Sequence, residues 1–405
     1  MADANFTKAA TGGRGGVAAY LAAVQFLFAL GWVVYVIFLP DLLVRAGIDK
    51  SWTPWVLALD QLVFVAADLG MGVAMDRARA AYRRIGGWLA ATVALSSVAM
   101  LAMPFGSALG APLFLTLTLI WVATSAALRA PPYVLMSRHA ATSSVPALAG
   151  LMLFGMALAA AAAPYLALVL KGVDPALPFA LVSLAIVAAN AGIVVAERTL
   201  NALPDDVAEP GPPLPLASMA AALLILGLFC AALGFQWQTA INAAAQVKRV
   251  ADASWLPYLL PVFWAGFAFG LLPAGTLGHR LGNARTAALA GIGGALALGV
   301  AAGATTPTVL GLAHFAAGGA WALAMCAGIG IAAASGRRGA EGRYTSIFFA
   351  LLAAGTLTRI AFNLGGVPQA LAAGADWAPV ALWAATGILF LQFARQPRPP
   401  SPSKP

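Results

Sequence analysis

The chain has 405 residues, of which 61% are hydrophobic and 9% are charged, and its formal net charge is +9. Since a soluble domain carries about 25% charged residues, this composition excludes an ordinary water-soluble protein. The basic residues lie between the apolar stretches and form no aromatic-interleaved stripe, which argues against nucleic acid as a partner.

Long apolar stretches recur from one end of the chain to the other, and each is long enough to cross a hydrocarbon core of roughly 30 Å. They do not alternate at every second residue as barrel strands do, so they favour helices. The sequence therefore predicts an all-α polytopic membrane protein of about twelve transmembrane helices. The spans are expected at 17–44, 54–75, 87–104, 110–135, 145–170, 176–196, 215–246, 255–277, 286–304, 308–334, 343–370 and 376–394.

One long polar stretch, residues 198–214, interrupts this series and carries four prolines and three acidic residues. It predicts a cytoplasmic linker between two six-helix halves, residues 1–197 and 215–395. The proline-rich tail, residues 396–405, is expected to be disordered. The two cysteines, Cys230 and Cys326, fall inside apolar spans and indicate no disulfide framework.

The distribution of lysine and arginine predicts the orientation in the membrane. With the N-terminus inside, sixteen of these residues fall in cytoplasmic segments and five in outer loops, and only Arg129 and Arg359 fall within spans. We therefore expect both termini in the cytoplasm, and we expect a bacterial inner membrane and a monomer.

The two halves carry matching segments at one offset of 203 residues. The segment 29–32 (ALGW) in the first span matches 232–235 (ALGF) in the seventh. Gly72 and Arg77 after the second span match Gly275 and Arg280 after the eighth. Two matches at one offset indicate duplicated halves, an architecture that places the substrate site near the midplane between them.

The loop after the second span carries a wider resemblance. Gly72, Asp76 and Arg77, followed by the basic pair Arg83 and Arg84, resemble the loop signature of the major facilitator superfamily. The resemblance implies that superfamily's twelve-helix fold, transport rather than enzyme activity, and a gating role for these five residues.

A narrower resemblance concerns the glycoside–pentoside–hexuronide cation symporters, the melibiose-permease type. The segment 68–76 is similar to that family's D-x-x-M-G-x-x-x-D, 132–135 is similar to its Pro-aromatic-x-Leu, and Arg359 lies in the helix that carries its functional basic residue. Phe64 and Ala130 stand where the family has further acids. The sequence therefore favours a proton over sodium as the coupling cation.

Charged residues within spans are costly and are functional candidates by default. Asp60 and Asp68 in the second span are the candidate coupling residues. They lie about 12 Å apart along a helix and about 80° apart around it, so they cannot share one proton. A structural role remains open for both: a salt bridge for Asp60 and a helix clamp for Asp68. Arg129 and Arg359 are candidate partners for a carboxylate or an anionic substrate, because arginine keeps its charge.

Polar and aromatic residues of three spans predict a substrate-binding cavity. Gln238, Asn242 and Gln246 lie at i, i+4 and i+8 on one helix face, which we expect to point into the cavity. Hydrogen bonding between helices is the alternative for this face. Gln25, Trp32 and Tyr35 in the first span and Asn363 in the eleventh complete the predicted wall.

These patterns predict a secondary active transporter, proton-coupled, that moves a small polar solute by alternating access, with no cofactor and no protein metal site. An exporter of amphipathic compounds is one alternative. A copper carrier is another, because the methionine pairs 71/75 and 152/156 each place two thioethers on one helix face. A membrane assembly factor or receptor without transport is the alternative of another class.

Overall fold

A computed structural model describes residues 2–82, 86–139, 144–202 and 212–396. All regular elements in these ranges are helices, and the ranges contain no strand. Twelve of the helices described are long and apolar enough to cross a membrane, as the sequence predicts. The first half contains α1 (Ala2–Arg45), α2 (Thr53–Tyr82), α3 (Gly86–Leu109), α4 (Ala111–Ser125) with α5 (Ala130–Arg138), α6 (Val145–Val169) and α7 (Ala176–Asn201).

The second half continues with six further spans. Its elements are α8 (Met219–Trp237) with η3 (Gln238–Asn242) and α9 (Ala243–Val250), α10 (Leu256–Leu281), α11 (Asn283–Ala302), α12 (Pro307–Leu364) and α14 (Ala378–Arg395). A straight helix of 58 residues would extend about 87 Å. Accordingly, α12 holds two spans, a first arm Pro307–Gly336 and a second arm Ala340–Leu364.

The predicted boundaries need two corrections. The eleventh span ends at Leu364 and not near residue 370, because Gly365 and the left-handed Gly366 stop the helix before the short α13 (Val367–Leu371). The first residues of the predicted linker belong to α7, which continues to Asn201. Most of that linker and nearly all of the predicted tail lie outside the described residues.

The two halves begin their second spans with the same local structure, which is a third match at the offset of 203 residues. Asp49 accepts a hydrogen bond from the backbone N–H of Ser51, and Asp252 accepts one from Ser254, in each case capping one turn of 3-10 helix before a proline-led α-helix. A short acceptor side chain at this position satisfies an otherwise unpaired N–H. These matching caps agree with the duplicated halves inferred from the sequence.

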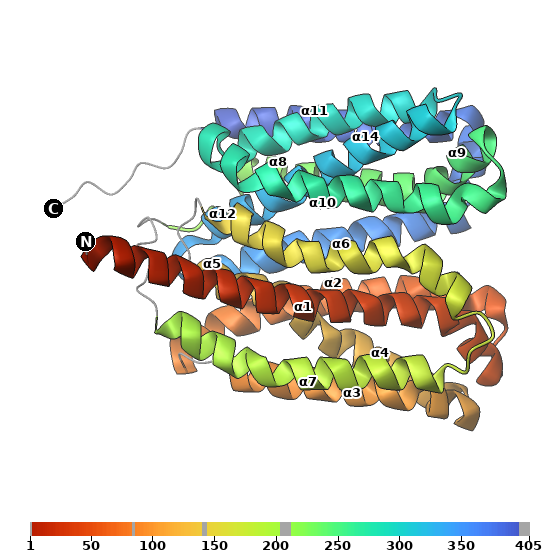
Figure 1. Ribbon diagram of the computed structural model, residues 1–405, viewed down its shortest axis with the longest axis horizontal. Coiled ribbons are helices and arrows are strands. Elements are labelled where there is room, and N and C mark those ends of the chain that lie inside the picture. Colours follow the sequence, from red (N-terminus) through yellow and green to blue (C-terminus); the bar gives the residue numbers. More distant parts are fainter. Residues whose placement is uncertain (1, 83–85, 140–143, 203–211, 397–405) are drawn as a thin grey trace.

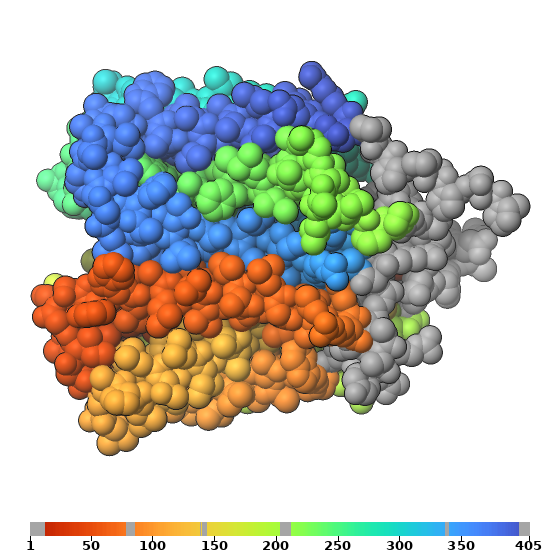
Figure 2. Space-filling view, turned by 180° about the vertical axis from the view of Figure 1, so that it is seen from behind, coloured from red at the N-terminus to blue at the C-terminus, as the bar shows by residue number. Residues whose placement is uncertain are grey.

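The two halves meet along two helix pairs, α2 with α12 and α6 with α10. Figure 1 shows α8, α10, α11 and α14 on one side of the bundle and α1, α3, α4 and α7 on the other. In Figure 2 the orange α2 lies directly against the blue α12 along the junction. Helix α1 begins, and α14 ends, at the same end of the bundle, here named the terminal end (Figure 1).

Candidate functional site

The fourth span is broken at Arg129, and the break places this side chain at the centre of the molecule. Pro131 and Pro132 follow, and a proline removes a backbone donor and disfavours helical geometry in the residue before it. The chain accordingly ends α4, makes one turn of 3-10 helix (Ala126–Leu128) and leaves Arg129 at φ −91°, ψ −87°, outside the helical region, before α5 begins.

Arg129 joins the two halves through one guanidinium group. Its Nη2 lies 3.2 Å from Oδ2 of Asp68 on α2, and it also donates a 3.0 Å hydrogen bond to the carbonyl of Phe349 on the second arm of α12. The Asp68 side chain is fully buried, and the Phe64 ring packs 4.3 Å from the Arg129 Cζ. A buried ion pair therefore lies at the junction of α2, α5 and α12.

Asp60, eight residues earlier on α2, has a different environment. It is fully buried, and Oδ2 accepts a 2.7 Å hydrogen bond from the hydroxyl of Tyr35 on α1, while Oδ1 has no hydrogen-bond partner. Asp60 and Tyr35 lie behind the cavity wall rather than on it, since neither lines the cavity described next. The sequence placed Tyr35 in the cavity wall and Asp60 among the coupling residues, whereas in the structure Trp32, which packs against Tyr35, lines the cavity in its place.

A cavity of about 400 Å³ lies between the halves. Such a volume is at the small end of the range of about 300–1,000 Å³ that holds small organic ligands. Its polar side chains are three glutamines, a threonine and two arginines, and no carboxylate lines it. Its aromatic side chains are Phe28, Trp32, Phe64, Tyr133, Phe235, Trp264, Trp321 and Phe349.

Arg359 lies on the second arm of α12 and lines this cavity. Within the described residues it forms no ion pair, and its buried Nε has no hydrogen-bond partner. Phe349, Leu352, Thr356 and Arg359 follow each other at helical spacing on the cavity face of this arm. The cavity thus contains one arginine with an internal carboxylate partner and one without.

Four of the predicted substrate-binding residues line the cavity: Gln25, Trp32, Arg129 and Arg359. Gln25 also donates a 2.6 Å hydrogen bond to the carbonyl of Leu128, which fixes it beside the helix break. Tyr35 lies behind the wall, and Asn363 is exposed and does not line the cavity.

The amide face of the seventh span points away from the cavity, so its predicted direction is wrong. Gln238 donates to Oε1 of Gln246 at 2.8 Å, and His314 on the first arm of α12 lies within 3.2 Å of both amides. Gln246 in turn donates to Asp376, and Asn242 donates to the carbonyl of Ala375. Gln238, Asn242 and Gln246 therefore follow the alternative expectation, hydrogen bonding between helices. Gln236, in the same span, lines the cavity.

The predicted gate residues lie where the halves touch at the terminal end. Both carboxylate oxygens of Asp76 accept hydrogen bonds from backbone N–H groups of the second arm of α12, from Gly342 at 2.8 Å and from Arg343 at 3.0 Å. A Cβ at Gly72 would lie 2.6 Å from that of Ser346, so α2 and α12 need glycine here to approach. Arg77 is exposed, and Arg83 and Arg84 lie outside the described residues.

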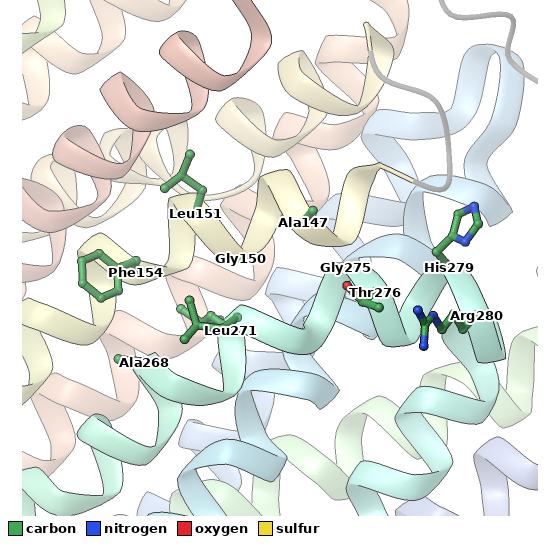
Figure 3. Close-up of a pocket in the computed structure, with 11 residues that line it drawn as sticks. Ala147, Gly150, Leu151, Phe154, Ala268, Leu271, Gly275, Thr276, His279 and Arg280 are labelled. Carbon is green, nitrogen blue, oxygen red and sulfur yellow. The ribbon is translucent and has the colours of Figure 1, made fainter. Parts of the chain in front are cut away.

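A second hollow, about 710 Å³, lies between α6 and α10, with Leu151, Phe154 and Leu271 along its sides and His279 and Arg280 at one end (Figure 3). Its floor is the contact of the halves, since a Cβ at Gly275 would lie 2.6 Å from that of Ala147. This hollow is larger in volume than the central cavity, but Arg129 and Arg359 line the central cavity and not this hollow. It marks the second line along which the halves close at the terminal end.

The described residues include no group of three or more His, Cys, Asp or Glu side chains that could hold a metal ion. Met71, Met75 and Met152 are buried in helix packing, and of these four paired methionines only Met156 lines the cavity. The two methionine pairs therefore do not converge on one site.

Sequence reasoning missed the tryptophans of the second half, Trp264 and Trp321, which line the cavity together with Phe235. Phe235 and Trp321 stack at 4.5 Å with an angle of 8° between their planes. A signal was present, because tryptophan in a membrane helix is typical of the interfaces, whereas both of these lie far from the ends of their spans.

Comparisons with known proteins identify the fold. No family model and no curated protein matches the chain. Among solved structures, it is similar to the fucose:proton symporter FucP of E. coli, with 15% identity, a TM-score of 0.67 and coverage of 94% of this chain and 98% of that one. It is similar to the human organic anion transporter MFSD10, with 13% identity, a TM-score of 0.68 and coverage of 93% and 98%.

A third similar structure is a bacterial homologue of the iron transporter ferroportin in an outward-facing state, with 12% identity, a TM-score of 0.69 and coverage of 94% and 100%. The likeness extends over nearly the whole of each chain. The chain therefore has the fold of the major facilitator superfamily transporters.

Proposed function

We propose that the protein is a proton-coupled secondary transporter that moves a small organic solute by alternating access, with Asp68 as the proton site and Arg129 as the link between proton and solute. The observation that carries this proposal is the buried ion pair of Asp68 with Arg129, whose guanidinium group also lines the cavity and contacts the opposite half.

Charge balance supplies the coupling. Removing one partner of a buried ion pair leaves an uncompensated charge, which costs about 3–5 kcal/mol. Two states reduce that cost: ionised Asp68 paired with Arg129, and protonated Asp68 with Arg129 hydrogen-bonded to an acceptor group of the solute. A proton without solute, or solute without a proton, leaves one group unmatched. Proton and solute therefore cross together.

Asp60 is proposed as a positioning residue for α1 and not as the coupling site. It is buried behind the wall and bonded to Tyr35, so a solute in the cavity does not touch it. The geometry thus favours Asp68 over Asp60 as the coupling carboxylate.

Alternating access is supported by the position of the contacts between the halves. At the terminal end the halves touch through Gly72 with Ser346 and through Ala147 with Gly275. The α2 residues that line the cavity, Leu57, Gln61 and Phe64, lie further toward the opposite end. Breaking the terminal contacts and closing the opposite end would expose the same cavity to the other side.

Transport by reconstituted protein tests the proton site. In liposomes with an imposed pH gradient, Asp68→Asn is expected to abolish uphill accumulation and to retain exchange of solute, since exchange needs no net proton release. Asp60→Asn is the matched control and is expected to keep proton-driven accumulation. Accumulation by folded Asp68→Asn, or its loss in Asp60→Asn alone, would contradict the assignment.

Other features remain proposals of the same kind. We propose a bacterial inner membrane, a monomer, two halves joined by the linker near residues 198–214, and a cytoplasmic terminal end. Reporter fusions after Lys171 and after Ser335 are expected to report the outer and inner sides, respectively. The fixed charges of the cavity favour a specific solute carrier over an exporter of varied amphipathic compounds.

A further inference from the structure

Arg359, the cavity arginine without a carboxylate partner, provides evidence about the charge of the solute. Arg129 has Asp68 as its partner, but Arg359 has no carboxylate within ion-pair distance among the described residues. Arginine does not lose its proton in proteins, so this charge is permanent. Arg359 is half-buried, a charge withdrawn from water without a partner is costly, and the wall of the cavity offers no anion to compensate it.

We infer that the solute is an amphipathic organic monoanion, an aromatic carboxylate, whose carboxylate pairs with Arg359 and whose ring lies between the aromatic walls of the two halves. The inference rests on the proposed function, in that it takes the central cavity as the transport site. It goes beyond that proposal because proton coupling by Asp68 and Arg129 requires only an acceptor group on the solute and not a charge.

The guanidinium group of Arg359 is suited to this partner. A planar fork of donors can bind both oxygens of a carboxylate, and hydrogen bonds to charged groups are about twice as strong as neutral ones. The Nε of Arg359 is buried and still lacks an acceptor, so one donor of the fork is available. A carboxylate would satisfy that donor and compensate the charge in a single contact.

The aromatic walls of the cavity indicate the chemical nature of the rest of the solute. Trp32 and Phe64 form one wall, with ring centroids 5.4 Å apart, and Phe235, Trp264 and Trp321 form the other. Aromatic pairs are more stable in offset or edge-to-face geometry than apart. An aromatic ring buries its faces against both halves.

The separation of Phe349 and Arg359 along α12 determines how the solute lies in the cavity. Phe349, whose carbonyl holds Arg129, and Arg359 are ten residues apart on one helix, which corresponds to about 15 Å along its axis. A ligand of one or two rings whose carboxylate lies at Arg359 therefore extends toward Arg129, where Gln25 and Gln61 offer polar contacts. A hydroxyl group on the far side of the ring would meet this polar end.

A matched pair of ligands tests the charge of the solute. Isothermal titration of the purified full chain with 4-hydroxyphenylacetate and with its amide compares two molecules that differ mainly in charge. The carboxylate is expected to bind at least tenfold more tightly than the amide. Equal affinities, or no binding by this acid, by benzoate and by 2-naphthoate, would overturn the inference.

Substitutions test the position of the contact. Arg359→Gln is expected to reduce carboxylate affinity about tenfold or more, and Arg359→Lys, which keeps the charge but not the fork, to reduce it less. Arg280→Gln, at the exposed end of α10, is the control and should bind normally. Unchanged affinity in folded Arg359→Gln would also overturn the inference. Carboxylate binding without proton-driven uptake would refute the coupling proposal alone.

Discussion

The two halves of the protein handle buried charge differently. The first half buries two carboxylates on α2 and gives each a partner within that half: Tyr35 for Asp60 and Arg129 for Asp68. The second half buries a network of amides and His314 away from the cavity, and it presents to the cavity an arginine without a partner. Both α2 carboxylates thus have a side-chain partner within the first half, whereas Arg359 in the second half has none.

This difference is consistent with a division of labour between the two halves. In the proposed mechanism, the half with the internal ion pair takes up a proton at Asp68, which frees Arg129 for the solute. The half with the open charge needs a ligand from outside to compensate it. A cavity between them joins both properties, which a single half does not have.

The largest expected effect concerns the stability of the paired and unpaired arginines. Arg129→Gln should lower the free energy of unfolding by about 3–5 kcal/mol, because Asp68 is left buried without its counter-charge. Adding Asp68→Asn should recover most of that loss. Arg359→Gln should not destabilise the protein, since no buried carboxylate depends on it. Denaturant unfolding in detergent would measure all three, and equal losses for Arg129→Gln and Arg359→Gln would remove the distinction.

A second prediction concerns the contact of the halves at the terminal end. Asp76→Asn should slow transport about tenfold, because two charge-assisted hydrogen bonds to the backbone of α12 are weakened, each worth about 1.5–3 kcal/mol. Binding in the distant cavity should stay within about twofold by titration. Asp174→Asn, in an exposed ion pair with Arg45, is the control. A large loss of affinity with normal exchange would show that Asp76 acts at the binding site.

Two glutamines of the seventh span provide a smaller test. Gln246→Leu should lower stability by about 1–3 kcal/mol, since His314 and Asp376 each lose a partner, and should leave binding unchanged. Gln236→Leu should weaken binding severalfold and leave stability nearly unchanged, because Gln236 faces the cavity. The reverse pattern would restore the original expectation that the amide face binds the solute.

The smallest expected effect concerns the matching caps, Asp49 and Asp252, at the end opposite to the terminal end. Hydrogen bonds from Ser51 and Ser254 hold the pKa of each carboxyl below its ordinary value of 3.8. The ionised form therefore stabilises the fold above about pH 4, and this contribution disappears as the pH falls through the lowered pKa. Asp49→Ala and Asp252→Ala should each lower the melting temperature slightly at pH 7, and this effect should shrink as the pH falls below about 4. Unequal effects would show that the duplicated caps have diverged.

Much of the fold follows from the sequence alone. The twelve spans, their approximate bounds and the duplicated halves depend on apolar length and on repeated segments, which are local properties of the chain. The break at Arg129 was not predicted, since the fourth span was expected to be continuous over 110–135, although Pro131 and Pro132 are a signal for it. The candidate charges within spans were also identifiable, because charge in an apolar stretch is costly wherever the helix finally packs.

Only the tertiary structure decided which of these residues meet. Asp60 and Asp68 lie on one helix, but the packing of α1 against one and of Arg129 against the other determines which is linked to the cavity. Gln236 and Gln238 are two residues apart in one span, and the packing of the span decides which amide faces the cavity and which faces His314. Helical periodicity defines the faces of a helix, whereas the direction of each face depends on contacts with helices distant in the sequence.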